Sequence, residues 1–468
     1  MKLDLLIKDC LVVDPKNRRK DVASVGISEG KIVEVGDIDK QQARQTVSFP
    51  DKMLMPGLID THVHTGNAIG LTMMTRAGVT TALDLGGPAA ELVQIVKEQG
   101  TGMNIAVLNG IHPGQTVSNN DPSSSELRSF VKKSLDYGAL GIKLLGGHYP
   151  LTPQATTNAI KVANEQRVYV AFHAGSTRNG SNLNGLLDAI EFSENSPFHL
   201  AHVNSYCRGL IRGDPIEEVQ QALHALKKNR HVISEFHLAT VNGTSGKCMN
   251  GIPESNVTKT CLKMGGYEST EEGLKKAFLG GWGYCVAENI NGENRLFDGK
   301  GALEYWLTNQ GNCIVGFPVN NRVTAFHCAT GKDEQNKFII DALSTDGGSI
   351  PRNWLLRFGL QLVDFGAWTI TEFVDRTSLT PSKMLGLPNK GHLSPGADAD
   401  LTIVDLKSHE AVATIVGGDF ICVNGVITGK GGTILCTEQG KDKLIELGIN
   451  HEVVNLEQSM LYKGRGTN

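Results

Sequence analysis

The chain has 468 residues, 40% hydrophobic and 20% charged, with a formal net charge of −4. These values are ordinary for a globular protein and give no general attraction to nucleic acid. The stretch from Met1 to Cys10 carries charges within its apolar run, so it fits neither a signal peptide nor a membrane span. Nine scattered cysteines without a Cys-x-x-Cys pair favour reduced thiols in a cytoplasmic protein over a disulfide framework.

Both ends of the chain predict short β-strands. In the first 53 residues the strand pattern covers Leu3–Ile7, Leu11–Val13, Ala23–Ser28, Lys31–Val35 and Gln45–Phe49. Near the other end, Gly396–Asp405 contains a strand, and Asp419–Ile427 predicts another with a turn at Asn424-Gly425. Neither piece can bury much by itself. We therefore predict one small β-sandwich built from residues 1–53 and 391–435.

Between these pieces, strand and helix patterns alternate. The predicted strands cover residues 58–64, 77–84, 104–108, 139–145, 168–173, 198–203, 231–237 and 338–346. Helical spacing follows several of them, at Leu92 to Val96, Glu126 to Tyr137 and Ile216 to Lys228. The last of these helices has Asp214 as expected N-cap, Pro215 at its first position and Glu217 to complete a capping box. Eight βα units predict a closed α/β barrel of the TIM type over residues 54–390, with its active site where strands end.

Residues 240–334 interrupt this alternation. They show only a weak helix near Glu271 to Phe278, and a structureless loop of that length is unusual. We expect an inserted subdomain that covers the barrel mouth and shapes a substrate pocket. Its cysteines lack the paired spacing typical of zinc sites. Residues 436–468 form a tail whose apolar residues around Leu444 predict a helix that can pack on a neighbouring subunit.

His62 and His64 end the first barrel strand with one residue between them. In an extended backbone, side chains at i and i+2 point to the same side, so the two imidazoles converge on one point and can share a metal. Pro56-Gly57 supplies the sharp entry into this strand, because glycine permits conformations that other residues avoid. The alternative is two histidines held by hydrogen bonds at a strand end.

Other candidate functional residues recur at the ends of later strands, namely Lys143, His173, His202 and Asp346. Each has an ordinary structural explanation when taken singly. A lone histidine is often a hydrogen-bonded core residue, and Asp346 before two glycines can serve as a helix cap or turn residue. Six such side chains at one barrel face favour a functional site instead.

Two segments carry a resemblance to a known family. Residues 56–64, PGLIDTHVH, closely match the first-strand motif of the amidohydrolase superfamily, and residues 396–405, GADADLTIVD, are similar to its closing sandwich strand. The chain resembles the branch of hydantoinases, dihydroorotases, isoaspartyl dipeptidases and D-aminoacylases. The resemblance covers most of residues 1–430 apart from the insertion, and it implies homo-oligomers. Its end motifs are specific, whereas the assignments of Lys143 and Asp346 depend on order and spacing.

The resemblance implies two divalent metal ions, most often zinc. One ion would be held by His62, His64 and Asp346, and the other by His173 and His202. Lys143 would bridge them after carboxylation by carbon dioxide to a carbamate. A protonated lysine would repel both ions, whereas a desolvated lysine near cations has a lowered pKa and a neutral amine that can take up carbon dioxide. A surface lysine is the alternative, but the apolar stretch around Lys143 favours burial.

Two divalent ions that share a water make hydroxide available near neutral pH, and Asp346 can carry the proton to a departing nitrogen. The first interpretation is therefore hydrolysis of an amide in a small molecule: a cyclic amide, an N-acyl amino acid or a dipeptide. His148 and Tyr149 lie on the loop where hydantoinases place an oxyanion-stabilising tyrosine, and either could act so here. Candidate substrate-binding residues are Asn204, Ser205, Arg208, His237, Ser349 and Arg352. An arginine at the mouth would favour a carboxylate-bearing substrate.

Three alternatives remain. A deaminase of the same superfamily typically has one metal and a His-x-x-Glu step, which His173-Ala-Gly-Ser176 and His202-Val-Asn-Ser205 lack. Some hydantoinase relatives are structural proteins that have lost the ligands, whereas every ligand position is filled here. The D-aminoacylase pattern uses a bridging cysteine, and no cysteine lies near these strand ends before Cys207.

Overall fold

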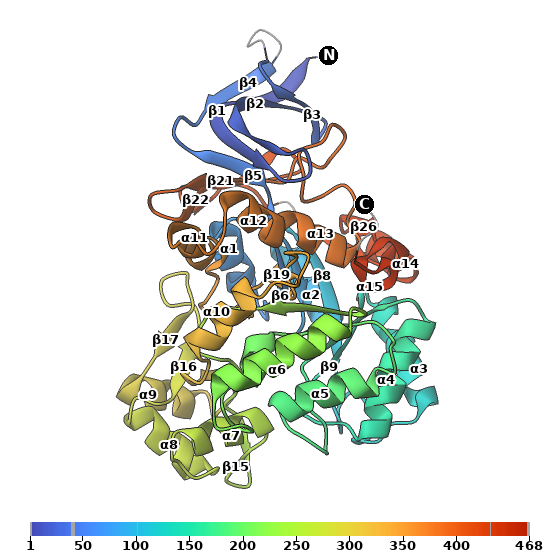
Figure 1. The fold of residues 1–468 in the computed structure, drawn as a ribbon, viewed down its shortest axis with the longest axis vertical. Coiled ribbons are helices and arrows are strands. Elements are labelled where there is room, and N and C mark those ends of the chain that lie inside the picture. Colours follow the sequence, from blue (N-terminus) through green and yellow to red (C-terminus); the bar gives the residue numbers. More distant parts are fainter. Residues whose placement is uncertain (1, 39–42, 101, 431, 466–468) are drawn as a thin grey trace.

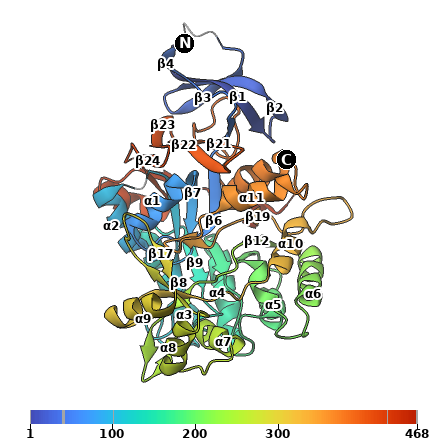
Figure 2. The same ribbon diagram turned by 90° about the vertical axis from the view of Figure 1, so that its left-hand side faces the viewer.

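The structure, a computed structural model, describes residues 2–38, 43–100, 102–430 and 432–465. Three parts follow one another along its longest axis: a β domain, a barrel and an inserted subdomain (Figure 1). The view turned by 90° shows the same order (Figure 2). The expectations for residues 1 and 39–42 of the first β piece and for 466–468 of the tail lie outside the described residues. Within the described ranges, no helix is long and apolar enough to cross a membrane.

The β domain is one nine-stranded sheet built from both chain ends. Its order is β24-β23-β22-β21-β5-β1-β2-β3, and β4 pairs with β1. The strands are β1 (Leu3–Asp14), β2 (Arg19–Ser28), β3 (Lys31–Gly36), β4 (Ala43–Ser48), β5 (Met53–Pro56), β21 (Leu401–Asp405), β22 (Glu410–Val416), β23 (Asp419–Val423) and β24 (Val426–Ile427). The sheet curls on itself, because Ile32 N donates to Ala397 O and Ala399 N to Gly30 O, both at 2.8 Å. Apolar residues of both chain ends, such as Leu5 and Ile403, share its core.

Two details of this domain differ from the sequence prediction. The strands predicted at 3–7 and 11–13 are the halves of β1, which a bulge between Ile7 and Cys10 interrupts. The unpredicted strand β5 joins the sheet by pairing with β1 and antiparallel with β21. Because β6 begins at Leu58, two residues after β5 ends at Pro56, this sheet sits at the entry of the barrel.

The barrel consists of eight parallel strands, the last in two pieces. They are β6 (Leu58–His64), β7 (Val79–Asp84), β8 (Asn104–Ile111), β9 (Gly141–Leu144), β10 (Tyr169–Phe172), β11 (Phe198–Leu200), β12 (Val232–Phe236), and β19 (Ala342–Leu343) with β20 (Gly347–Gly348). β19 pairs with β12 and β20 pairs with β6, which closes the barrel. The eighth strand predicted over 338–346 was therefore wrong in its bounds.

Helices cover the outside of the barrel (Figures 1 and 2). They are α1 (Ala68–Arg76), α2 (Ala89–Gln99), α3 (Ser124–Asp136), α4 (Pro153–Glu165), α5 (Leu183–Phe192), α6 (Pro215–Lys228), α10 (Arg322–Thr330), α11 (Leu355–Asp364), α12 (Ile370–Val374) and α13 (Thr380–Leu385). Asp214 caps α6 as predicted, by accepting from Ile216 N. The predicted capping box is wrong: Glu217 accepts a hydrogen bond from Gln221 Nε2 at 2.9 Å instead.

The insertion between β12 and α10 has its own core, which includes Phe278, Trp306 and Phe317. A four-stranded sheet contains β13 (Thr244–Ser245), β18 (Ile314–Gly316), β16 (Tyr284–Ala287) and β17 (Arg295–Phe297), and a hairpin pairs β14 (Cys248–Met249) with β15 (Ile252–Pro253). Its helices are α7 (Asn256–Met264), α8 (Glu271–Leu279) and α9 (Gly299–Thr308). All nine cysteines of the chain are free.

The tail packs on the barrel of its own chain. It contains β25 (Thr433–Cys436), α14 (Glu438–Glu446), β26 (His451–Val453) and α15 (Met460–Lys463). β25 pairs in parallel with the start of β8, and Leu444 of α14 is buried in a cluster with Ile105 and Val107. Leu444 and Ile449 are thus covered within the chain, whereas Ile445 is 55% exposed, and contact of this helix with a neighbouring subunit stays a prediction.

Candidate metal centre

The six side chains predicted at strand ends meet at one rim of the barrel. All six line one cavity, together with residues of the loops and of the insertion. The lining residues are His62, His64, Lys143, Leu145, His148, His173, Ser181, His202, Ser205, Arg208, Asn242, Gly243, Val257 and Asp346. The insertion contributes at least Asn242, Gly243 and Val257, so it closes one side of this cavity.

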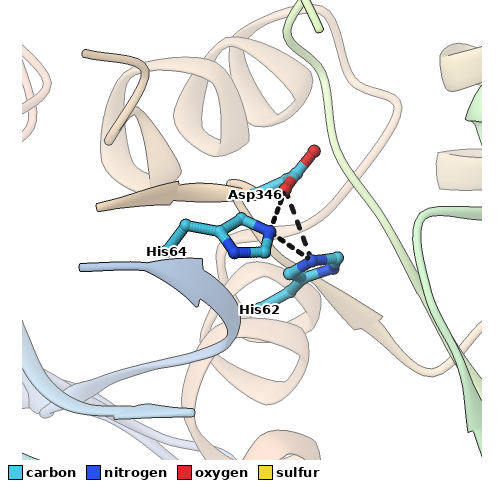
Figure 3. A group of neighbouring side chains, drawn as sticks. All are labelled: His62, His64 and Asp346. Carbon is cyan, nitrogen blue, oxygen red and sulfur yellow. Dashed lines mark hydrogen bonds and ion pairs between the residues drawn. The ribbon is translucent and has the colours of Figure 1, made fainter. Parts of the chain in front are cut away.

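One candidate metal position lies between His62, His64 and Asp346 (Figure 3). The Nε2 atoms of the two histidines are 3.2 Å apart, and Asp346 Oδ1 lies 3.3 Å from His62 Nε2 and 3.1 Å from His64 Nε2. The His-x-His spacing thus brings both rings to one point, as predicted from the strand period. Within the described ranges, this is the one group of three such side chains close enough to hold an ion.

A second position lies between His173 and His202. Nδ1 of His173 and Nε2 of His202 are 3.1 Å apart. The rings of His62 and His202 stack with centroids 5.1 Å apart, so the two positions are adjacent. The other nitrogen of His173, Nε2, is 2.9 Å from Ser181 Oγ, and this contact orients the ring.

Lys143 lies on β9 and is only 1% exposed. Its Nζ atom has no hydrogen-bond partner among the described residues. Burial lowers the pKa of Lys143 to about 8, against opposing attraction from Glu235 and Asp346. A buried amine whose pKa is lowered to about 8 loses its proton far more readily than an ordinary lysine, and the neutral amine is the form that can take up carbon dioxide and then serve as an anionic ligand.

The imidazoles are held in the form that metals bind. Burial lowers the pKa of His62, His173 and His202 well below 6.5, so each is neutral and carries a lone pair. Glu235 on β12 is fully buried, and its Oε1 is 2.6 Å from His62 Nδ1. This contact places the proton of His62 on Nδ1 and leaves Nε2 free for an ion.

Two of the six residues have unusual backbone conformations. His202 has a φ of 32° and Asp346 a φ of 51°, in the left-handed region that non-glycine residues rarely adopt. Hydrogen bonds hold both: His202 N donates to Glu235 Oε1 at 2.6 Å, and Asp346 N donates to His62 O at 2.9 Å. Such conformations cost on the order of 1–3 kcal/mol each and concentrate at functional sites.

Gly57, at the entry of β6, serves a purpose other than the predicted one. It does not adopt a positive φ. A Cβ at this position would lie 2.1 Å from Thr80 Oγ1 on the neighbouring strand β7. The glycine therefore allows a close approach of two strands, and the prediction that it was needed for its backbone freedom was wrong.

The two candidate oxyanion residues lie in different surroundings. His148 lines the cavity, with its ring 4.7 Å from that of His173, and its Nδ1 is 3.0 Å from Ser255 Oγ. Tyr149 is not among the lining residues. Its ring packs on His112 with centroids 3.8 Å apart, and its hydroxyl bonds Ser245 of the insertion.

Of the candidate substrate-binding residues, Ser205 and Arg208 line the cavity. The other four make contacts of different kinds, outside the lining. Asn204 Oδ1 accepts from His237 N, Ser349 Oγ donates to Thr65 O, and His237 Nε2 is 3.1 Å from Ser205 Oγ.

Arg352 forms an ion pair and a backbone hydrogen bond with Asp346. Its Nη2 lies 2.5 Å from Asp346 Oδ2, and its Nε donates to the Asp346 carbonyl at 2.6 Å. Burial alone would raise the pKa of Asp346, but Arg352, His62 and His64 outweigh it and hold that pKa well below 3.8. Asp346 is therefore ionised, with one oxygen on the arginine and the other toward the histidines.

Two buried carboxylates that were not predicted from the sequence support the site. Glu235 accepts from His62, His202 and Ser344, and Asp60 accepts from His62 N and from the backbone and hydroxyl of Thr345. The available signal was an acidic residue inside an otherwise apolar strand, in Val-Ile-Ser-Glu-Phe and in Leu-Ile-Asp. Acidic side chains are almost never fully buried unless paired, so such positions point to a network.

The donor set fits a pair of divalent ions. Neutral imidazoles and a carboxylate are typical zinc ligands. The amine of Lys143 has no hydrogen-bond partner among the described residues, and as an anionic carbamate it would be stabilised by adjacent cations.

The Amidohydrolase family profile matches residues 305–432. A dihydroorotase of Geobacter metallireducens is 22% identical over 429 residues, which cover 87% of this chain and 91% of the relative. A solved D-aminoacylase has a TM-score of 0.66 at 16% identity, covering 92% of this chain and 99% of the other. An N-acyl-D-glutamate deacylase of Bordetella bronchiseptica, complexed with zinc, has a TM-score of 0.66 at 14% identity, covering 92% and 99%.

The structural likenesses concern the fold, and at these identities they carry no more. The family match adds the segment that contains Asp346 and the closing strand of the β domain. Taken with the first-strand motif and the full-length similarity to dihydroorotases, these findings support the resemblance of the chain to the amidohydrolase superfamily.

Proposed function

We propose that the protein is a metal-dependent hydrolase that cleaves an amide C–N bond, other than an ordinary peptide bond, in a small molecule. One observation carries this proposal: six ligand-type side chains from five barrel strands converge on one cavity at the strand ends. The relatives named above act on such bonds or are named for doing so, which supports the same reading. Cyclic amides, N-acyl amino acids and dipeptides all fall within it.

The metal centre is part of the proposal. His62, His64 and Asp346 would hold one ion, His173 and His202 the second, and Lys143 would bridge them as a carbamate. Zinc is the proposed metal, supported by the imidazole-rich donor set and by the zinc in the deacylase of similar fold. When bound, two such ions supply a water whose pKa is low enough for hydroxide near neutral pH.

The chain's own residues would handle the proton. Asp346 is ionised, and its Oδ1 faces the histidines while Arg352 fixes its other oxygen. It can accept a proton from the attacking water and deliver it to the departing nitrogen, which is the general base and acid role predicted for it. The ion pair with Arg352 keeps the carboxylate from rotating between these two events.

His148 is the better of the two candidates for stabilising the oxyanion. Ser255 Oγ accepts from Thr244 Oγ1 at 2.9 Å and from Val257 N at 3.2 Å, which leaves its own proton for His148 Nδ1. Nε2 of His148 then carries the ring proton. Burial lowers the pKa of His148 to about 3, so the ring is a neutral donor to a developing oxyanion.

Metal analysis followed by a substrate screen tests the proposal. Purified protein loaded with zinc should hold about two ions per chain and hydrolyse at least one of the cyclic amides, N-acyl-D- and L-amino acids or β-aspartyl dipeptides. A protein without stoichiometric divalent ion would instead be the non-catalytic relative considered above. Lys143→Ala should lose most metal and turnover, and short carboxylic acids should restore part of both by standing in for the carbamate.

Cytoplasmic residence and homo-oligomers also belong to the proposal. The nine free cysteines suit a reducing compartment. Oligomers are supported by the family resemblance, and sedimentation of the purified protein tests them.

A further inference from the structure

The cavity contains a cation that the metal centre does not use. Arg208 lines it, after the short 3₁₀ turn η2 (Val203–Tyr206) that follows β11. Asp346 is the one carboxylate among the described lining residues, and it is already paired with Arg352 at 2.5 Å. No carboxylate in the described part of the chain forms an ion pair with Arg208. The guanidinium therefore faces the cavity without a counter-ion.

The contacts of Arg208 hold it without neutralising it. Nη2 donates to Asn320 Oδ1 at 2.9 Å, and Asn320 is a neutral amide that is itself only 6% exposed. Asn320 Nδ2 donates to Ala239 O at 3.3 Å, which fixes the direction of its oxygen. The Nε atom of Arg208 is buried and has no hydrogen-bond partner among the described residues.

Glu218 holds the loop after Arg208 in place without contacting the guanidinium. Both carboxylate oxygens of Glu218, which is fully buried on α6, accept backbone hydrogen bonds from Gly209, Ile211 and Arg212 at 2.6–2.9 Å. The Glu218 carboxylate is therefore occupied by these main-chain hydrogen bonds and does not pair with Arg208. These hydrogen bonds fix the backbone next to Arg208, while the guanidinium has no carboxylate partner among the described residues.

Arg208 is partly buried, and a charge that is withdrawn from water without gaining a partner is unfavourable for folding. Such a group is kept where a ligand supplies the missing partner, and the planar fork of an arginine matches a carboxylate. We propose that Arg208 binds a carboxylate of the substrate. The protein would then act on amides that carry a carboxylate group and discriminate against uncharged amides. The inference deepens the proposed hydrolase function and depends on it for the reaction, but the anion site can be tested by itself.

Matched pairs of compounds provide the test. Zinc-loaded full-length protein is given dihydroorotate and dihydrouracil, and N-acetyl-D- and L-alanine with their primary amides, and both binding by calorimetry and kcat/KM are measured. The acid of at least one pair should bind and react about a hundredfold better than its neutral partner. Comparable binding and turnover of both members, or binding of no acid, would overturn the proposal.

Two variants assign the preference to Arg208. Arg208→Gln should weaken the acid about a hundredfold and change the neutral partner by less than a few fold, which removes the preference. Asn320→Asp should do the same with the arginine in place, because the new carboxylate pairs with Arg208 internally. The matched control is Arg212→Gln, since Arg212 is exposed, lies four residues away and bonds only Gln221 through its side chain in the described structure.

The failures of the two proposals are distinguishable. Arg208-dependent binding of an acid without any hydrolysis would refute the hydrolase and leave the anion site standing. Hydrolysis whose acid preference persists in both variants, or that loses acid and neutral substrates equally in Arg208→Gln, would leave the hydrolase standing and refute the role of Arg208.

Discussion

Replacing Lys143 by methionine should stabilise the metal-free protein while it destroys the proposed metal centre. Methionine keeps an unbranched apolar stem and removes an amine that is 1% exposed and without a hydrogen-bond partner. Burial lowers the pKa of Lys143 from 10.5 to about 8. That difference corresponds to roughly 3 kcal/mol that the charged form costs the folded state.

The sign follows from proton linkage. The folded pKa lies below the unfolded one, so between about pH 8 and 10.5 the unfolded chain holds a proton that the folded chain has released. The stability of the metal-free wild type should therefore rise with pH through this window, and below pH 8 the full cost is present. Lys143→Met should lack this rise and be the more stable protein at pH 7.

The assay compares thermal unfolding of chelator-treated protein in buffer depleted of carbon dioxide, at pH 7 and pH 10. We expect Lys143→Met to unfold a few degrees above wild type at pH 7, and the gap to close at high pH. The control is Lys161→Met, since Lys161 is exposed on α4. An unfolding temperature of Lys143→Met equal to or below that of wild type at pH 7 would refute the idea of an uncompensated buried amine.

Two further substitutions address the carboxylates of the site. Asp346→Asn should leave metal largely bound and slow turnover by about 10²–10⁴-fold, because the proton carrier is gone; an unchanged single-turnover rate would exclude that role. Glu235→Ala should weaken metal binding about 10–100-fold in chelator competition, because His62 loses the acceptor that fixes its tautomer; an affinity equal to wild type would show that Glu235 does not orient the ligand.

Much of the site could be predicted because barrel geometry is regular. A period of two places His62 and His64 on one side, and parallel strands put their carboxyl ends at the same rim, so the positions of His173 and His202 follow from strand order. The role of Lys143 depended in addition on the resemblance to a known family. None of these predictions required knowledge of which side chain contacts which.

The features that escaped prediction depend on contacts across the barrel. The bond from Asp346 N to His62 O belongs to the gap between β19 and β20, and no local pattern marks an eighth strand in two pieces. Arg352 looked available for substrate because its partner, Asp346, is six residues away and on the far side of two glycines. Burial of Leu444 likewise depends on β8, more than three hundred residues earlier in the chain.

The unfavourable features of this fold lie together at one rim. His202 and Asp346 adopt left-handed conformations, Lys143 has no hydrogen-bond partner, and Arg208 has no counter-ion among the described residues. Each of these features lowers the stability of the folded protein when no ligand is bound, and local sequence preferences disfavour such features. In the proposed enzyme, carbon dioxide and metal would neutralise the lysine, and an acidic substrate would neutralise the arginine. Ligands that bind only the folded state stabilise it, so the same residues that weaken the free protein would tie its stability to the molecules it acts on.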